Sequence, residues 1–436
     1  MIHAVDGHSF VSRLGGAAMP LMSRVDLDPL IDAIGDARYV LLGSGTRGTA
    51  QFFTSRAEIT KRLIVEKGFS IVAADGNCAD LARLNAYVHD RTDSGASAAT
   101  VLRDFRDWAG GVWVNHQMAI FAEWLHEHNR CDAQDGGVSV FGLDVLGLGA
   151  TMDIVLNHLA QRQPAARQAT RKAAARFAPH SGDMESSPAL VPPAHEQEVL
   201  ELLLAQAPSR INDTSVCEPF DHEHEAALRR HRERFYRALF GDLREAWNIR
   251  ERQMTETLDD LLARRGPSAK VVVWEHNTHV GDARYANMGV RQFTNAGQLV
   301  REQHGEGPDD RDGVFLVGFG THHGTVLAAP AWGQPMMRIA VPAARRGSVE
   351  DFMHSAVRGD AVFVFDGSAA GGVPGFEAPL GHRAIGIVYD PALEQLSHYV
   401  PSIIPRRYDA FVFVDETRAA DPLVPIPETP RASSRA

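Results

Sequence analysis

Four histidines of this 436-residue sequence follow directly after two short apolar runs. His276 and His279 lie in one of these stretches, and His322 and His323 lie in the other. Imidazole exchanges protons near neutral pH, so this density of histidine predicts acid–base chemistry. Other charged side chains follow three more apolar runs. The five polar stretches are residues 43–48, 75–78, 142–144, 275–279 and 318–324.

The histidines have two alternative interpretations. His276 and His279 could be structural side chains held by hydrogen bonds. They could also bind a metal ion together with Asp75 and His322. His-x-x-His without a defined third ligand is a weak zinc pattern, so we expect no metal site and no cofactor.

The roles of three further residues in the polar stretches also have alternative interpretations. Asp144 follows an apolar run, where aspartate commonly caps a helix. Cys78 could act as a nucleophile, but a thiol needs a neighbour that lowers its pKa. Ser44 lies in Gly-Ser-Gly and lacks the full Gly-x-Ser-x-Gly pattern of a nucleophilic serine.

The elements that position these residues alternate between strands and helices. A strand at 38–43, a helical pattern at 49–66 and a strand at 69–74 form a βαβ unit, whose two strands should be parallel. Ligands bind beyond the carboxyl ends of such strands, which is where the polar stretches fall. We therefore predict an α/β fold with a mostly parallel sheet flanked by helices and a helical subdomain inserted in it. The other predicted strands are 138–142, 269–274, 314–318, 361–365, 384–389 and 409–414.

The chain organisation follows from the same pattern. Residues 1–25 are predicted to be an irregular extension, and residues 26–150 the first part of the α/β core. Residues 151–264 form the helical subdomain, with a flexible Pro/Ser/Gly-rich segment at 178–195. Residues 265–421 complete the core, and the proline-rich residues 422–436 are a disordered tail.

Composition limits the possible partners. The net charge of −11 argues against a nucleic-acid surface, and no run of about 18 apolar residues is present to span a membrane. Three cysteines cannot build a disulfide framework, and the N-terminus lacks the pattern of a signal peptide. We expect a cytoplasmic protein whose partner is a small-molecule substrate, and its oligomeric state stays open.

Several ordered motifs resemble one known family. Residues 274–283, Trp-Glu-His-Asn-Thr-His-Val-Gly-Asp-Ala, are similar to the Trp-Ala-His-Asn-x-His-x-Gly-Asp-Ala segment of the erythromycin esterase family. Residues 41–49, Leu-Leu-Gly-Ser-Gly-Thr-Arg-Gly-Thr, resemble its Leu-Gly-Glu-x-Thr-His-Gly-Thr loop. The resemblance covers residues 26–421, interrupted at 165–195. Further matches are residues 121–129, 247–251, 295–299, 318–321, 383–386 and 397–399.

The resemblance implies a metal-independent hydrolase in which a histidine activates water against a macrolide ester. Carried over by motif, Arg56 matches the family's arginine, Asp75 its acidic residue, and His276 and His279 its later histidine pair. Substrate binding is assigned to Arg56, Trp113 and Arg250. Trp113 lies in a stretch whose flanking residues differ from the family's, and Arg250 lies in the matching segment 247–251.

This sequence departs from the family on the first loop. Ser44 stands where the family has glutamate, and Arg47 stands at the water-activating histidine. A guanidinium group stays protonated and cannot accept a proton, so loss of the general base should lower ester hydrolysis by about 10²–10⁴-fold. Glu275 adds a carboxyl group where the family has a small residue. The chain is therefore identified as a divergent member with a remodelled site.

Three hypotheses follow for its function. In the first, His276 or His279, helped by Asp75 or Glu275, performs acid–base chemistry such as cyclisation, elimination, isomerisation or acyl transfer on a polyketide-like or otherwise tailored metabolite. Ser44, Arg47 and the other assigned arginines then bind the substrate, the guanidinium groups through forked hydrogen bonds. In the second, an ester hydrolase has moved its base to one of these histidines. In the third, the protein binds a ligand without catalysis.

Overall fold

A central sheet organises the protein in this computed structural model, which describes residues 7–92, 95–105, 109–131, 136–162, 196–211, 222–307, 313–368 and 371–427. Nine strands of the described residues form the sheet, and β7 (Met337–Val341) pairs with β6 outside the main order. The other eight, in spatial order, are β1 (Met19–Pro20), β8 (Ala361–Val364), β11 (Ala410–Thr417), β6 (Val314–Ala328), β2 (Tyr39–Leu42), β5 (Val271–Trp274), β3 (Ile71–Asn77) and β4 (Ser139–Asp144).

The sheet is mostly parallel, which confirms the predicted fold class. The strands from β11 to β4 run parallel, whereas β1, β8 and β7 are antiparallel to their neighbours. β2 and β3, predicted from one βαβ unit, are parallel but not adjacent, because β5 lies between them. A separate pair joins β9 (Leu380–Arg383) to β10 (Tyr399–Ser402). The insertion of β5 places residues 275–279 between the stretches that follow β2 and β3.

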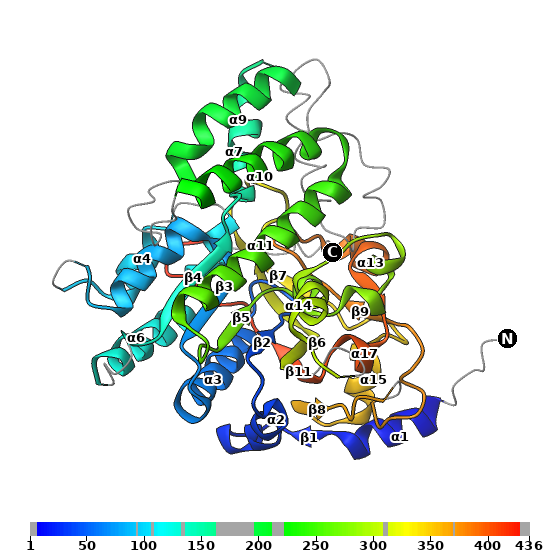
Figure 1. Cartoon of the computed structure of the whole chain (residues 1–436). Helices are drawn as coiled ribbons and strands as arrows, with labels where there is room; N and C mark the ends of the chain where they lie inside the picture. The colour runs from blue at the N-terminus through cyan, green and yellow to red at the C-terminus, as the bar shows by residue number, and fades with distance from the viewer. Residues whose placement is uncertain are drawn as a thin grey trace.

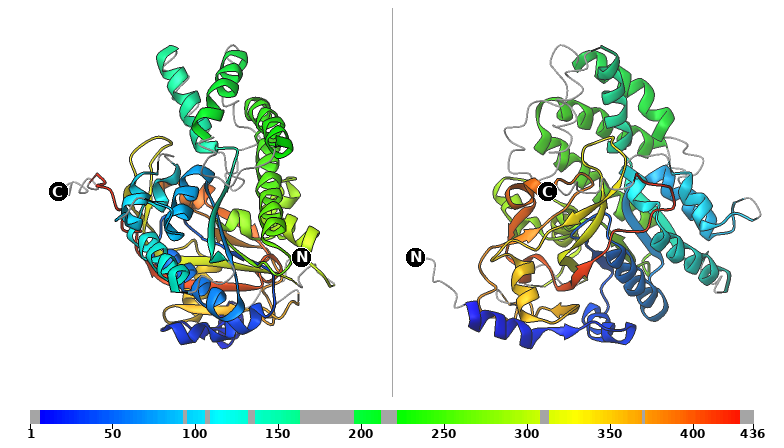
Figure 2. Two further views of the ribbon diagram at one scale, coloured as in Figure 1. Left: turned by 60° about the vertical axis from the view of Figure 1, so that its left-hand side comes forward. Right: turned by 180° about the vertical axis from the view of Figure 1, so that it is seen from behind.

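Helices cover both faces of the sheet (Figure 2). Successive strand residues alternate between two cores: Val40 and Leu42 pack on one face, and Tyr39 and Leu41 on the other. The first face is covered by α2 (Asp28–Ile34), α3 (Ala50–Lys67), α4 (Cys78–Val88), α5 (Ala98–Arg103) and α6 (His116–Cys131). The second is covered by α1 (Gly7–Ala17), α11 (Leu243–Arg265), α14 (Ala296–His304), α15 (Val349–Ala356) and α17 (Ile404–Arg407).

A helical part extends beyond the end of β4 (Figure 1). It contains α7 (Leu148–Arg162), α9 (Glu196–Ile211) and α10 (His222–Gly241), and the first turns of α11 pack against it. Val155, Val199, Phe235 and Trp247 belong to its own apolar core. The segment predicted to be flexible, 178–195, lies outside the described residues. Short elements fill the remaining connections: α12 (Asn277–Val280), α13 (Asn287–Val290), α16 (Glu394–Ser397), and the 3-10 helices at Arg24–Leu27, Ala109–Trp113, Ala283–Tyr285 and Pro391–Leu393.

The two ends of the chain are more ordered than their composition predicted. Within the predicted irregular extension, α1 buries Phe10 and Leu14 against the second core, and β1 pairs with β8. Of the predicted disordered tail, residues 422–427 are described, and Leu423 is buried while its amide donates to the carbonyl of Val114. In both places, isolated apolar residues in a Gly- or Pro-rich stretch bury their side chains in the core.

Two predicted element boundaries were wrong. Residues 318–324 were predicted to be a loop after a strand, but they lie inside the 15-residue strand β6, paired with β11. Residues 384–389 were predicted to be a strand, but the strand is β9, which ends at Arg383. The apolar residues that follow make only isolated bridges, in which Ile385 pairs with Thr46 and Val388 with Ala329.

No described helix combines the length and the apolar character that crossing a membrane requires.

Candidate active site

The carboxyl ends of four adjacent strands bring the predicted site residues to one edge of the sheet. β2, β5, β3 and β4 are neighbours in this order. Arg47 follows β2, and Glu275 and His276 follow β5. Asp75 lies near the end of β3, and Asp144 is the last residue of β4. The buried helix α11 crosses the same edge and adds its own charged residues. This convergence agrees with the general placement of ligand sites in parallel sheets.

Arg47 lies at the centre of the cluster. Its Nη1 donates to Oδ2 of Asp75 at 2.6 Å, and its Nη2 donates to Nε2 of His279 at 3.1 Å. The Asp75 side chain is 2% exposed, whereas that of Arg47 is 21% exposed. Burial acts to raise the pKa of Asp75, but the positive charge and hydrogen bond of Arg47, with His279 and Arg250 behind it, hold that pKa below its usual value. Asp75 is therefore an ionised carboxylate paired with a guanidinium group.

His279 is held as a neutral imidazole. Its Nδ1 donates to Oε1 of Glu251 at 2.6 Å, and its ring stacks on Trp247 with centroids 4.8 Å apart. Burial first, and then the charges of Arg250 and Arg47, lower its pKa well below the usual value. Since Nε2 accepts from Arg47, the proton of the neutral ring sits on Nδ1. Arg47 thus occupies the lone pair that a general base would use.

Two buried carboxyl groups near His279 hold their protons unusually strongly. Burial raises the pKa of Glu251 to about 8, against the opposing charge of Arg250. The Oε2 of Glu251 accepts the amide hydrogen of Ala296 at 3.0 Å. Neither oxygen of Glu275 has a hydrogen-bond partner among the described residues, and burial, then Glu251 and Asp75, raise its pKa well above the usual value. Glu275 is accordingly a neutral carboxylic acid, able to donate a proton.

His276 approaches the cluster through its backbone. Its amide donates to Oδ2 of Asp75 at 3.3 Å. Its side chain caps α12, with Nδ1 accepting the amide hydrogen of Thr278 at 3.3 Å. A ring that accepts at Nδ1 carries its proton at Nε2, so His276 is a hydrogen-bond donor at that nitrogen. The two histidines therefore present opposite tautomers.

Arg56 sits in an aromatic enclosure. Its guanidinium carbon lies 4.9 Å from the ring centroids of Phe53 and Trp274 and 5.8 Å from that of Trp113. Burial lowers its pKa to about 9, against the attraction of Asp75. Its Nε has no hydrogen-bond partner among the described residues. Trp113 and Arg56, both predicted to bind substrate, thus pack against each other beside the carboxyl ends of the strands.

The other predicted residues have local partners. The hydroxyl of Ser44 is buried and donates to the carbonyl of Thr46, so it shapes the loop rather than standing free as a nucleophile. Arg250 lies 3.5 Å from Asp144 and 3.9 Å from Glu251. Asp144 also accepts the amide hydrogens at the start of α7, which is the capping role considered from sequence.

Not all candidate residues meet. His322 and His323 lie inside β6, and no hydrogen bond or ion pair of the described residues joins them to Arg47, Asp75 or His279. Sequence reasoning, in turn, missed two residues on α11. Glu251 and Trp247 lie four residues apart on one helix face and hold His279 from two sides. Both lie in segment 247–251, whose resemblance to the family indicated only Arg250 as a site residue.

The comparisons with known proteins agree with this architecture. A crystal structure described as a succinoglycan biosynthesis protein shares 16% identity, with a TM-score of 0.64 over 95% of this chain and 98% of that one. A protein from Bacillus cereus shares 16% identity, with a TM-score of 0.66 over 96% and 99%. The erythromycin esterase EreC, a histidine-to-asparagine mutant in its open conformation, shares 15%, with a TM-score of 0.57 over 95% and 98%. At these identities the likeness shows the fold.

The sequence gives the more specific result. The sequence model of the erythromycin esterase family matches residues 64–417, which include Asp75, Glu251, His276 and His279. The first loop, with Ser44 and Arg47, precedes the matched residues. Since the match extends over most of the chain, the protein belongs to the erythromycin esterase family.

Proposed function

We infer that the protein is an enzyme that transfers protons on a small organic metabolite, and that ordinary macrolide hydrolysis is not its reaction. One observation carries this proposal: Arg47 donates hydrogen bonds to both Asp75 and Nε2 of His279. A hydrolase of this fold needs a free base to activate water, worth about 10²–10⁴-fold in rate. Here the lone pair of the buried imidazole is occupied by a cation that cannot take a proton.

Arg47 is suited to receive the substrate. It is the most exposed member of its triad with Asp75 and His279, and its planar group offers forked donors to a carboxylate or a developing oxyanion. A substrate oxygen that takes over the donor at Nη2 releases Nε2 of His279. The imidazole can then accept a substrate proton at Nε2 while Nδ1 keeps its own proton in the bond to Glu251.

Glu275 supplies the complementary acid in this scheme. Its buried, protonated carboxyl group gives a proton to the substrate atom that gains the electron pair, while His279 takes the proton that the substrate loses. One proton enters and one leaves, so the enzyme returns to its starting state after proton exchange. Elimination, isomerisation, cyclisation and acyl transfer on a polyketide-like or otherwise tailored metabolite all fit this sequence of steps. A small molecule in the cytoplasm remains the expected partner.

A second candidate is an ester hydrolase with a relocated base. It is favoured by the 2.6 Å bond between His279 and Glu251, because a carboxyl group behind Nδ1 fixes the orientation and the tautomer of an imidazole. The solved structure of an erythromycin esterase with the same fold adds to this candidate. Both candidates use His279, and they differ in whether water enters the product.

The test compares substrate loss and product mass by liquid chromatography–mass spectrometry, with erythromycin, a panel of small esters, and water enriched in ¹⁸O. The wild type is run beside the double variant Arg47→His/Ser44→Glu and a control, Arg62→His, whose arginine pairs with Asp28 and Glu66 on the surface. We expect an inert wild type and control, and hydrolysis by the double variant. Macrolide hydrolysis by the wild type, with ¹⁸O in the product, would replace our proposal with the second candidate.

A further inference from the structure

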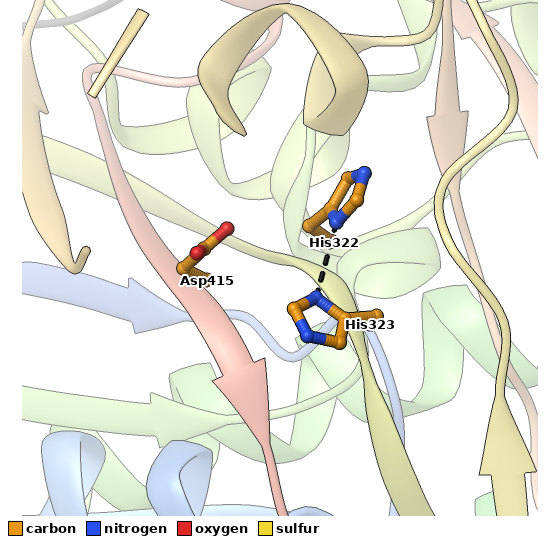
Figure 3. A group of neighbouring side chains, drawn as sticks. All are labelled: His322, His323 and Asp415. Atoms are coloured by element: carbon orange, nitrogen blue, oxygen red, sulfur yellow. Dashed lines mark hydrogen bonds between the residues drawn. The ribbon is translucent and has the colours of Figure 1, made fainter. Parts of the chain in front are cut away.

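A second group of ionisable side chains lies apart from the candidate active site. His322 and His323 are adjacent on β6, and Asp415 lies on the neighbouring strand β11 (Figure 3). One ligand atom from each of the three side chains can be chosen so that all lie within 4.8 Å of one another. The histidines line a surface pocket of about 510 Å³, together with His354 from α15.

The two histidine rings lie together, edge to face with centroids 5.2 Å apart and an interplanar angle of 80°, although neighbouring residues of a regular strand point to opposite faces of a sheet. Their Nδ1 atoms share a hydrogen bond at 3.1 Å, drawn as the dashed line in Figure 3. The following residue, Gly324, has φ of +140°, a backbone conformation that favours glycine, and an added Cβ there would collide with the carbonyl of Thr417. The local backbone thus departs from a regular strand where the two imidazoles meet.

This separation suits a shared metal ion. Two nitrogens bound to a tetrahedral zinc ion at about 2.0–2.1 Å are held about 3.3 Å apart. The Nδ1 atoms of His322 and His323 are already within a few tenths of an ångström of that spacing. A carboxylate within reach of both completes a set of two imidazoles and one oxygen. Imidazole and carboxylate donors together favour zinc and its first-row neighbours over magnesium or calcium.

His354 supports the set from the pocket side. Its Nδ1 donates to Oδ1 of Asp415 at 2.6 Å, and its ring stacks on His322 with centroids 3.7 Å apart and an interplanar angle of 6°. A hydrogen bond of this kind orients a ligating side chain.

We propose that His322, His323 and Asp415 bind one divalent first-row transition-metal ion, with His354 as a positioning residue. Three protein ligands leave a coordination position for water or a ligand from the pocket, as in sites that bind a reacting molecule. Asp415 completes the set when its carboxylate turns toward the two imidazoles, from which its ligand atom lies within 4.8 Å. The site is separate from the cluster around Arg47, and it differs from the sequence-based expectation of no metal site, so the experiment below decides between the two.

The experiment uses untagged, full-length protein stripped with a chelator, and Zn²⁺ and Co²⁺ as the probes. Isothermal titration with Zn²⁺ is expected to show one ion per chain, and Co²⁺ to give the absorption bands of a low-coordinate nitrogen–oxygen site. His323→Ala and Asp415→Asn should each lower the affinity at least 10-fold. His354→Ala should weaken binding less than either ligand variant, because it removes the hydrogen bond to Asp415 and the ring stacked on His322 but no ligand atom.

The matched control is His126→Ala, which removes another histidine from a histidine–aspartate pair, His126 with Asp90. It should leave the affinity unchanged. Thermal unfolding with and without Zn²⁺ gives a second readout, because an ion that binds the folded state raises the melting temperature of the wild type and not of the ligand variants. Absence of one-to-one binding, or equal binding by wild type and the variants at His323 and Asp415, would overturn the proposal. An equal loss in the control would do the same.

Discussion

The pair between Arg47 and Asp75 makes a measurable prediction about the centre of the candidate site. At an effective dielectric constant of 20, two unit charges about 4 Å apart attract each other by about 4 kcal/mol. Asp75 is almost fully buried and Arg47 is one-fifth exposed, so part of this attraction offsets the loss of hydration. Arg47→Met leaves a buried carboxylate without its cation and should lower the free energy of unfolding by about 3 kcal/mol.

Asp75→Asn and the double variant Arg47→Met/Asp75→Asn complete a double-mutant cycle with the wild type and Arg47→Met. In Asp75→Asn the guanidinium group can turn toward solvent, so we expect a cost of about 1.5 kcal/mol. The double variant should lose about 2.5 kcal/mol, which is less than the sum of the single losses and gives a coupling of about 2 kcal/mol. Urea denaturation at pH 7 measures all four corners. A control cycle at Arg338 and Asp421, both half-exposed, should give a coupling below about 1 kcal/mol.

The lowered pKa of Asp75 predicts how the stability difference between wild type and Arg47→Met changes with pH. The pKa of Asp75 is lowered in the folded state, so its contribution is complete above the unfolded value of about 3.9 and is lost as the pH falls through the folded value. Without Arg47, burial raises the pKa of Asp75, so the difference in stability between wild type and Arg47→Met should be largest at neutral pH and shrink as the pH falls through the raised pKa of the variant and then the lowered pKa of the wild type. Single losses that add to the double loss within about 0.5 kcal/mol would refute the contact and the reasoning built on it.

Three further substitutions test the surroundings of the site and the fold. Glu251→Gln keeps the shape of the side chain behind Nδ1 of His279 but removes its carboxyl group. The kcat on an identified substrate should therefore fall about 10²-fold with KM little changed. An unchanged kcat would contradict the role of the His279–Glu251 pair. Trp113→Ala should lower the free energy of unfolding by about 3–5 kcal/mol in urea, since its buried ring packs on two neighbours. Leu423→Ala should cost about 2–3 kcal/mol and the exposed neighbour Val424→Ala less than about 0.5 kcal/mol, and equal effects would argue against burial of this segment.

Much of the fold could be predicted because local and global signals agree. The apolar runs before Gly43, Asp75 and Asp144 are fully or largely buried strands, and helices separate them as in any parallel sheet. The polar residues after them then meet at one edge by topology alone. The position of β5 between β2 and β3 was not predictable in this way, because it depends on a long-range pairing across about 200 residues.

The errors have physical causes in the sequence signals used. A glycine after an apolar run indicates the end of a strand, but in β6 Gly318 and Gly320 continue the strand because Phe411 and Tyr408 pack where their side chains would stand. Glu251, a partner of His279, was not predicted because it belongs to a helix rich in charged residues. In such a sequence a buried glutamate cannot be distinguished from an exposed one. Only the spacing of Trp247 and Glu251 on one face indicated that both turn inward.

The charges of the cluster can coexist only if its carboxyl groups differ in protonation. Asp75 can remain ionised because Arg47 pairs with it at 2.6 Å. Glu275 has no such partner, and a second buried carboxylate beside Asp75 would cost several kcal/mol. It is therefore held as a neutral acid. In the proposed function, Arg47 and Glu275 act together: Arg47 occupies the lone pair of the base until a substrate displaces it, and Glu275 supplies the proton.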